Sequence, residues 1–108
     1  MKFMISWEER PMGTADAYEA AQKRILGVFS QWKVPETMKV QQFLVRVGSY
    51  GGYMLVETDD ALAIHKAAST FPAFQFRVEV VADIEPAVGV EVEAIMWRDE
   101  LKLGPPFV

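Results

Sequence analysis

The order of two periodicities along the chain is the feature that most constrains its fold. Apolar side chains recur at every second position, as in half-buried strands, over residues 2–7, 38–48, 52–58 and 74–81. They recur at three- and four-residue spacing, as in amphipathic helices, over residues 14–34 and 59–71. An order β-α-β-β-α-β with right-handed crossovers predicts a ferredoxin-like α+β fold, in which a four-stranded antiparallel sheet carries both helices on one face. With 108 residues, the chain has the size of a single domain, residues 1–108.

Capping and stop residues give the expected limits of the two helices. Thr14 precedes the first helical stretch and Pro35 follows it, so Thr14 is the expected N-cap and Pro35 the stop. Thr58 or Asp59 is the expected cap of the second helix, which Pro72 ends.

The stretch after Asp83 fits two patterns. Val88, Val92 and Ile95 have helical spacing, whereas Val90 to Glu93 also alternates like a strand. We expect a C-terminal helix that extends to about Leu101, followed by a loose tail over about residues 102–108.

The two middle strands are expected to form a hairpin in which Val45 faces Leu55. This pairing leaves residues 49–51 as a three-residue turn, with Gly51 at the position that needs a positive φ. The sheet face toward the helices would then be apolar and consist of Phe3, Ile5, Trp7, Phe43, Val45, Val47, Tyr53, Leu55, Phe74, Phe76, Val78 and Val80.

The opposite face of the sheet mixes apolar and charged side chains. Its apolar members would be Met4, Val40, Leu44, Met54, Val56, Val81 and, at the rim, Met38. Monomers rarely leave so large an apolar patch in water, although one face of an antiparallel sheet is often wet. Because two-fold homodimers are the commonest soluble oligomers, we expect two copies to pack through this face as a dimeric α+β barrel.

Charged side chains on that face predict a cavity between the two sheets. Burying Lys2, Arg46, Arg77 and Glu79 would cost several kcal/mol per ion, and Glu79 can neutralise only one of the three cations. The surplus positive charge indicates a wet cavity that binds a small anionic or aromatic molecule. Alternatively, the long side chains reach the rim and no ligand binds. The expected ligand-binding residues are Lys2, Met4, Ser6, Gln42, Arg46, Met54, Arg77 and Glu79.

Composition removes several classes of function. The chain has no cysteine and a single histidine, His65, which we expect at the edge of the buried stripe of the second helix, so neither a thiolate site nor an ordinary zinc site is expected. A net charge of −4 without a basic run argues against nucleic acid as a partner. No stretch approaches the length of about 20 apolar residues that spans a membrane, and a cytoplasmic location is expected.

Four carboxylates follow strands of the expected sheet. Glu8 and Glu9 follow the first strand and Asp59 and Asp60 the third, and we expect these strands to run parallel, so that all four carboxylates meet at one edge. A hard cation such as Ca²⁺ is one interpretation, but the carboxylates more simply complement the dipoles of two helix N-termini. No metal is therefore expected.

Several stretches of the sequence together resemble a known family: Trp7-Glu8-Glu9-Arg10-Pro11, Ala21-Gln22-Lys23-Arg24, residues 46–59, Phe71-Pro72-Ala73-Phe74 with Phe76-Arg77-Val78, and residues 94–99. The family comprises small, mainly bacterial proteins known only as a domain of unknown function. The resemblance covers nearly the whole chain and implies the dimeric α+β barrel superfamily, with cofactor-independent antibiotic-biosynthesis monooxygenases, muconolactone isomerase and haem-degrading enzymes as relatives. Haem degradation in those relatives uses Asn, Trp and His, whereas this chain has no asparagine, and no cofactor is expected.

Three functions remain open at the level of sequence. The first is an uncharacterised homodimer that binds a small metabolite between its sheets. The second is a cofactor-independent monooxygenase, in which Arg46 and Arg77 with Tyr50 or Tyr53 would stabilise an anion, or an isomerase or cyclase, in which Glu79 would act with Ser6 or His65. The third is a structural or interaction module without a ligand.

Overall fold

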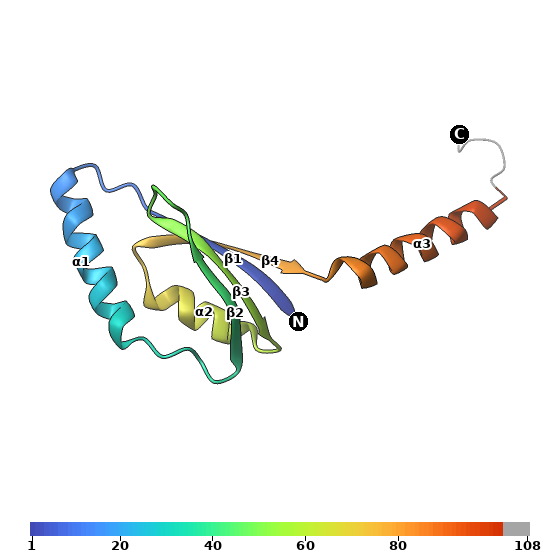
Figure 1. The fold of residues 1–108 in the computed structure, drawn as a ribbon, viewed down its shortest axis with the longest axis horizontal. Coiled ribbons are helices and arrows are strands. Elements are labelled where there is room, and N and C mark those ends of the chain that lie inside the picture. Colours follow the sequence, from blue (N-terminus) through green and yellow to red (C-terminus); the bar gives the residue numbers. More distant parts are fainter. Residues whose placement is uncertain (103–108) are drawn as a thin grey trace.

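A computed structural model describes residues 1–102, which form four strands and three helices (Figure 1). The strands are β1 (Lys2–Glu9), β2 (Met38–Val45), β3 (Gly51–Thr58) and β4 (Phe74–Val81). The helices are α1 (Ala15–Gln31), α2 (Ala61–Thr70) and α3 (Ile84–Glu100). The strands pair antiparallel in the order β2-β3-β1-β4, which confirms the ferredoxin-like α+β prediction and the helical reading of the C-terminal stretch. The predicted loose tail lies outside the described residues from 103 onward.

Local side-chain hydrogen bonds set where the first two helices begin. The Thr14 Oγ1 accepts from the Ala17 N–H at 3.1 Å, which confirms Thr14 as the N-cap of α1. The helix ends at Gln31, before Pro35 is reached. The cap of α2 was assigned wrongly from sequence, because Asp60 is the residue whose side chain accepts from the Leu62 N–H, at 3.1 Å.

The hairpin register differs from the predicted one. Leu44 faces Tyr53 and Phe43 faces Met54, an offset of three residues, and an odd offset turns every side chain of β3 to the other face. The turn is longer than predicted and spans residues 46–50, with Gly48 at a φ of 87° in place of Gly51. Val47, expected on the apolar face, is fully exposed in this turn.

Close packing around Gly52 is a physical reason for this register. A Cβ at Gly52 would lie 2.6 Å from Cη2 of Trp7, which is its partner across the β1–β3 pair. Only a residue without a side chain leaves room for the indole there. The glycine pair therefore serves packing inside the strand, and the turn forms before it.

A bulge between Val40 and Gln42 reverses the alternation of β2 as well. Val40 and Met38 consequently lie against the core together with Met54 and Val56, which β3 turns the same way. These four residues were wrongly predicted to face away from the helices, whereas Tyr53 and Leu55, predicted to face the helices, share the open face with Met4 and Leu44. The open face is therefore less apolar than the sequence suggested.

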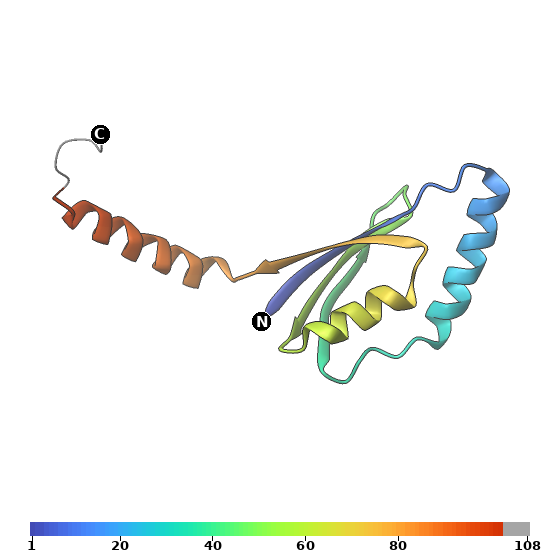
Figure 2. The ribbon, with the colours of Figure 1, turned by 180° about the vertical axis from the view of Figure 1, so that it is seen from behind.

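The main core lies between the sheet and α2. Its buried residues are Ile5, Met38, Met54, Val56, Ala63, Ile64 and Ala67. Both α1 and α2 lie on the same face of the sheet, as predicted, while α3 extends away from the sheet and from both helices (Figures 1 and 2). The longest dimension of the chain is 65 Å as a result.

No helix within residues 1–102 combines the length and the apolar character that crossing a lipid bilayer requires.

Candidate functional site

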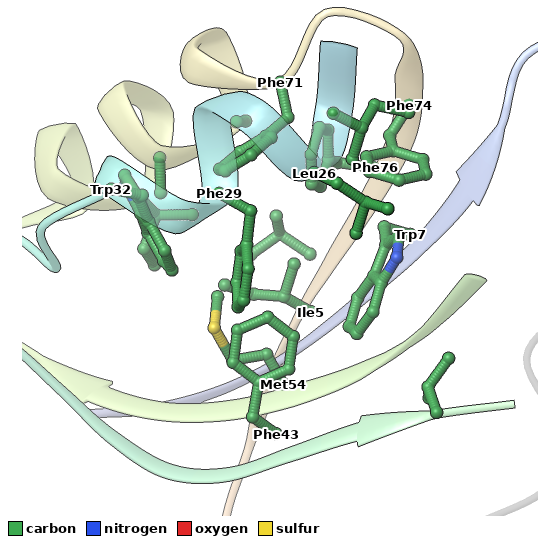
Figure 3. Close-up of a pocket in the computed structure, with 16 residues that line it drawn as sticks. Ile5, Trp7, Leu26, Phe29, Trp32, Phe43, Met54, Phe71, Phe74 and Phe76 are labelled. Carbon is green, nitrogen blue, oxygen red and sulfur yellow. The ribbon is translucent and has the colours of Figure 1, made fainter. Parts of the chain in front are cut away.

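A cavity of about 370 Å³ lies between the sheet and the two helices α1 and α2 (Figure 3). Its lining comes from all four strands, from α1, and from α2 with the residue that follows it. The residues are Ile5, Trp7, Phe43, Val45, Met54, Phe74, Phe76 and Val78 of the sheet, Ile25, Leu26, Phe29 and Trp32 of α1 and its C-cap, and Ile64, Ala67, Ala68 and Phe71. This pocket, here called the helix-side pocket, was not predicted from the sequence.

The pocket exists because α1 stands off from the sheet while α2 packs against it. Helix α2 places Ala63 and Ala67 toward the sheet, and these small side chains let the helix approach closely. No side chain of α1, residues 15–31, is buried. Leu26 and Phe29 line the pocket yet remain 59% and 47% exposed, so the pocket opens to solvent beside α1.

Aromatic rings form much of the pocket wall. The ring of Trp7 meets Phe43 edge to face with centroids 5.2 Å apart, and Phe43 meets Phe29 in the same way at 5.8 Å. Trp32 packs on Phe71 with centroids 5.4 Å apart and lies 6.5 Å from Phe43, so these rings form one contiguous cluster. Figure 3 shows Phe29 directed from α1 toward the sheet, between Trp32 and Trp7. Such a wall offers ring faces and edges to a planar apolar molecule.

Polar side chains stand at the end of this apolar space, namely the carboxylate of Glu9 with Gln22, Ser49 and Tyr50. A smaller cavity of about 170 Å³ adjoins the pocket, shares Trp7, Ile25 and Leu26 with it, and is also lined by Glu9 and Tyr50. Within residues 1–102, the Oε1 of Glu9 is buried and has no hydrogen-bond partner. A buried acceptor without a donor costs about 1–3 kcal/mol, so the position is ready for a donor from a ligand.

Sequence reasoning missed Glu9 as a site residue because it grouped Glu9 with Glu8 as a charge that follows the first strand. In the structure both belong to β1. The alternation of Ile5, Trp7 and Glu9 places all three side chains on the helix side and Glu8 on the other. An acidic residue in phase with two core residues was the available signal.

The predicted ligand-binding residues are only partly brought together. Strand pairing puts six of them on the open face of the sheet, namely Lys2, Met4, Ser6, Gln42, Arg77 and Glu79. Met54 was placed wrongly, because it is buried on the helix side and lines the pocket there. Arg46 lies at the start of the hairpin turn. Ligand binding by the open face stays a prediction.

The three cations on that side of the sheet each have a partner within the chain. Arg77 Nε lies 3.0 Å from a carboxylate oxygen of Glu79, and Lys2 Nζ lies 2.7 Å from Oδ1 of Asp83. The Nε of Arg46 donates to Ser49 Oγ at 3.2 Å, and its guanidinium carbon lies 6.0 Å from the centroid of the Tyr53 ring. Carboxylates thus neutralise two of the three cations, and the surplus positive charge that favoured an anionic ligand is smaller than predicted.

Two other predicted groupings are not assembled. His65 is exposed on α2, which covers the face of the sheet opposite to Glu79, so these two residues cannot act as an acid–base pair in one chain. Strands β1 and β3 run antiparallel, not parallel as expected, so Glu8 and Glu9 lie at the opposite end of the sheet from Asp59 and Asp60. Residues 1–102 hold no cluster of three or more side chains suited to a metal ion.

The three tryptophans also separate. Trp7, predicted on the apolar face of the sheet, packs against the core, and so does Trp32. Trp97 is 65% exposed on α3.

Comparison with known proteins gives a family and no activity. The model of a family described as "Domain of unknown function (DUF3303)" matches residues 1–95. The match confirms the expected resemblance to a family without known function, while the link to the dimeric α+β barrel superfamily stays a prediction. No curated protein matches the chain.

Proposed function

The chain belongs to the DUF3303 family, and because the family description names no activity, we propose a function from the pocket itself. The protein binds a small molecule that combines one aromatic ring with one hydrogen-bond donor, such as a phenolic hydroxyl. The ring lies in the helix-side pocket and the donor meets Glu9.

The observation that carries this proposal is the buried Oε1 of Glu9 beside an aromatic cavity, an acceptor that has no partner in the described part of the chain. An apolar pocket alone would bind any hydrophobic molecule of suitable size. A buried acceptor at its end that has no partner within residues 1–102 favours molecules that bring a donor, because a ligand without one leaves the carboxylate oxygen unsatisfied. The volume of about 370 Å³ lies in the range of pockets that hold small ligands.

Two energetic contributions favour such a ligand. The ring replaces water against the side chains of Trp7, Phe29 and Phe43, and aromatic contacts add about 0.5–1.5 kcal/mol beyond the area that they bury. A hydrogen bond to a charged acceptor contributes about 1.5–3 kcal/mol. The donor should therefore improve binding by about tenfold or more over the same ring without it.

Calorimetric titration with 4-ethylphenol and with ethylbenzene tests the proposal, since the two probes differ only in the hydroxyl. The wild-type protein should bind 4-ethylphenol more tightly by about tenfold or more. Glu9→Leu should abolish that preference, whereas Glu8→Gln, a change on the other face of the same strand, should preserve it. Absence of binding to both probes, or an equal preference in wild type and Glu9→Leu, would contradict the proposal and favour a structural or interaction module.

A catalytic role is the second candidate, and the same carboxylate favours it. A Glu9 carboxylate that accepts a hydrogen bond from a bound phenol polarises the O–H bond and raises the electron density of the ring, as a cofactor-independent monooxygenase or isomerase reaction would require. Oxygen consumption and absorbance changes on incubation with a bound phenol separate catalysis from simple binding. If the Glu9→Gln variant still turns over the phenol, Glu9 has no role in catalysis.

Two further predictions are carried forward without support from the contacts described above. The homodimer through the open face of the sheet now rests on Met4, Leu44, Tyr53, Leu55 and Val81 in place of the seven residues first assigned. The cytoplasmic location likewise stays a prediction.

A further inference from the structure

Helix α3 leaves the rest of the chain with its apolar side chains in water. It continues beyond the end of β4 and lies beside no other element in either view (Figures 1 and 2). None of its residues, 84–100, is buried. Val90, Met96 and Trp97 are among the large apolar side chains that it exposes. A helix of this composition is expected to be covered by protein.

The apolar side chains of α3 fall on two sides of the helix. At 100° per residue, Ile84, Val88, Val92 and Ile95 lie within one stripe. Val90, Ala94 and Trp97 form a second stripe on the opposite side. Helices with apolar residues on more than one side are typical of positions between two packed layers.

The connection to β4 directs α3 outward. Ala82 and Asp83 are the only residues between β4 and α3. Lys2 Nζ of β1 lies 2.7 Å from the Asp83 carboxylate, and the Asp83 carbonyl accepts from the Ala87 N–H at 3.3 Å. From this two-residue connection α3 continues past the sheet and does not turn back over it (Figure 1).

A matching apolar strip lies open along the edge of the sheet. Strand β4 is an edge strand, and Val78 and Val80 face the helix side next to Ile5 and Phe3. They remain 45% and 63% exposed. An α-helix of the length of α3 measures about 25 Å and a strand of the length of β4 about 26 Å, so one can lie along the other over its full length.

We propose that α3 docks on the β4 strip of a second copy of this chain, while the α3 of that copy docks on the first. When a helix of this length, with a diameter of about 10 Å, packs through half of its lateral surface, it buries about 400 Å². Two reciprocal contacts, each with a helix surface and a sheet surface, bury about 1,600 Å² in total, which is the area of a standard stable interface.

Charge favours docking on the sheet over pairing of the two α3 helices with each other. Residues 84–100 carry five carboxylates and one guanidinium, so two such helices side by side repel each other. Val78 belongs both to the strip and to the lining of the helix-side pocket. The α3 of the second copy would therefore close the β4 side of that pocket.

Cross-linking of the full-length protein tests the exchange directly. The chain has no cysteine, so each introduced thiol is unique. Val80→Cys and Val92→Cys are made as separate variants, mixed, and treated with a short bis-maleimide. The exchange predicts a linked dimer that contains one chain of each kind. Leu62→Cys, at an exposed apolar position on α2 away from the strip, replaces Val80→Cys as the matched control and should give no such product.

Sedimentation at micromolar concentration provides the second readout. Val88→Glu together with Val92→Glu should weaken dimerisation by about tenfold or more, because each buries a charge without a partner, while Leu62→Glu should not. A monomer in the wild type overturns the proposal. Cross-linking within one chain of the double variant Val80→Cys with Val92→Cys would also overturn it. A wild-type dimer whose variants give no mixed cross-link would overturn it too, and would indicate dimerisation through the open face of the sheet.

Discussion

Helices α1 and α2 lie on the same face of the same sheet, yet one closes the core and the other leaves a cavity. In α2 the side chains of Ala63, Ile64 and Ala67 are buried. In α1, residues 15–31, none is, although Ile25 and Phe29 point into the same space. Small side chains bring a helix close to a sheet, whereas large ones at the same positions hold it away. The proposed binding site is the space that this difference leaves open.

The two helices also differ in how they are attached. The Thr58 hydroxyl, buried at the end of β3, donates to the Thr37 carbonyl at 2.7 Å and accepts from the Asp60 N–H at 3.0 Å. This network links β3, the start of β2 and the N-cap of α2. Helix α1 begins with a single exposed cap bond at Thr14. The structure therefore predicts that α2 is the more firmly held of the two.

The largest expected difference is in the cost of truncating an apolar side chain. Ile64→Ala removes a side chain that is 6% exposed and should lower the free energy of unfolding by about 2–5 kcal/mol. Leu26→Ala, on α1, should cost less than about 1 kcal/mol, because that side chain is already largely in water. Urea unfolding measures both. Equal losses would mean that α1 packs as tightly as α2 in solution and that the pocket is closed.

Removal of the Thr58 hydroxyl should have the next largest effect. Thr58→Val keeps the shape of the side chain but leaves the Thr37 carbonyl and the Asp60 N–H without a partner, at a cost of about 1–3 kcal/mol. Thr70→Val is the control, because its hydroxyl bonds to the Lys66 carbonyl within one helix near the surface. If thermal unfolding shows the same loss for both variants, the anchoring role of Thr58 is wrong.

Removal of the two N-cap side chains should change the free energy of unfolding by smaller amounts. Asp60→Ala removes the bond from Leu62 N–H and a second one from the Thr37 hydroxyl, so we expect a loss of about 1–2 kcal/mol. Thr14→Ala removes one bond and should cost about 0.5–1 kcal/mol. Chemical denaturation of the two variants measures these losses of unfolding free energy, and a larger loss for Thr14→Ala would mean that α2 is not the more firmly capped helix.

The smallest effect concerns the third helix and appears only at high pH. The hydrogen bond to Asp83 raises the pKa of Lys2 above its usual value of 10.5. Because the pKa is raised in the folded state, the stabilisation is complete below that value and is lost as the pH rises through the folded-state pKa. The difference in Tm between wild type and Lys2→Gln should therefore be constant near neutrality and shrink in strong alkali. A difference in Tm that does not change with pH would mean that Lys2 does not stabilise the protein through its interaction with the Asp83 carboxylate.

The sequence was sufficient for the order of elements and insufficient for the faces of the hairpin. Four alternating stretches and two amphipathic ones define a ferredoxin-like chain, and each of these elements forms. In β3 both sets of alternate residues are apolar, so the pattern does not decide which set faces the core. The decision comes from the fit of Trp7 over Gly52 and from the bulge before Gln42, which are contacts between strands distant in sequence.

The candidate site was the least predictable part. The helical spacing over residues 14–34 predicted correctly that this helix lies on the sheet, and Ile25 and Phe29 of α1 face it across the pocket. Periodicity indicates a direction but no distance, so the space between that helix and the sheet could not be inferred. Similarly, the position of Glu9 on the helix side follows from counting along β1, but its lack of a partner depends on what the rest of the chain places around it.

The indole N–H signals of the three tryptophans provide the most direct test of the central claim, that the helix-side pocket is a binding site. Trp7 and Trp32 line the pocket, whereas Trp97 lies on α3, outside it. In a proton–nitrogen NMR titration of the wild-type protein with 4-ethylphenol, we expect saturable shifts for the Trp7 and Trp32 indoles and an unchanged signal for Trp97. Unchanged signals for Trp7 and Trp32 at saturating probe would contradict it.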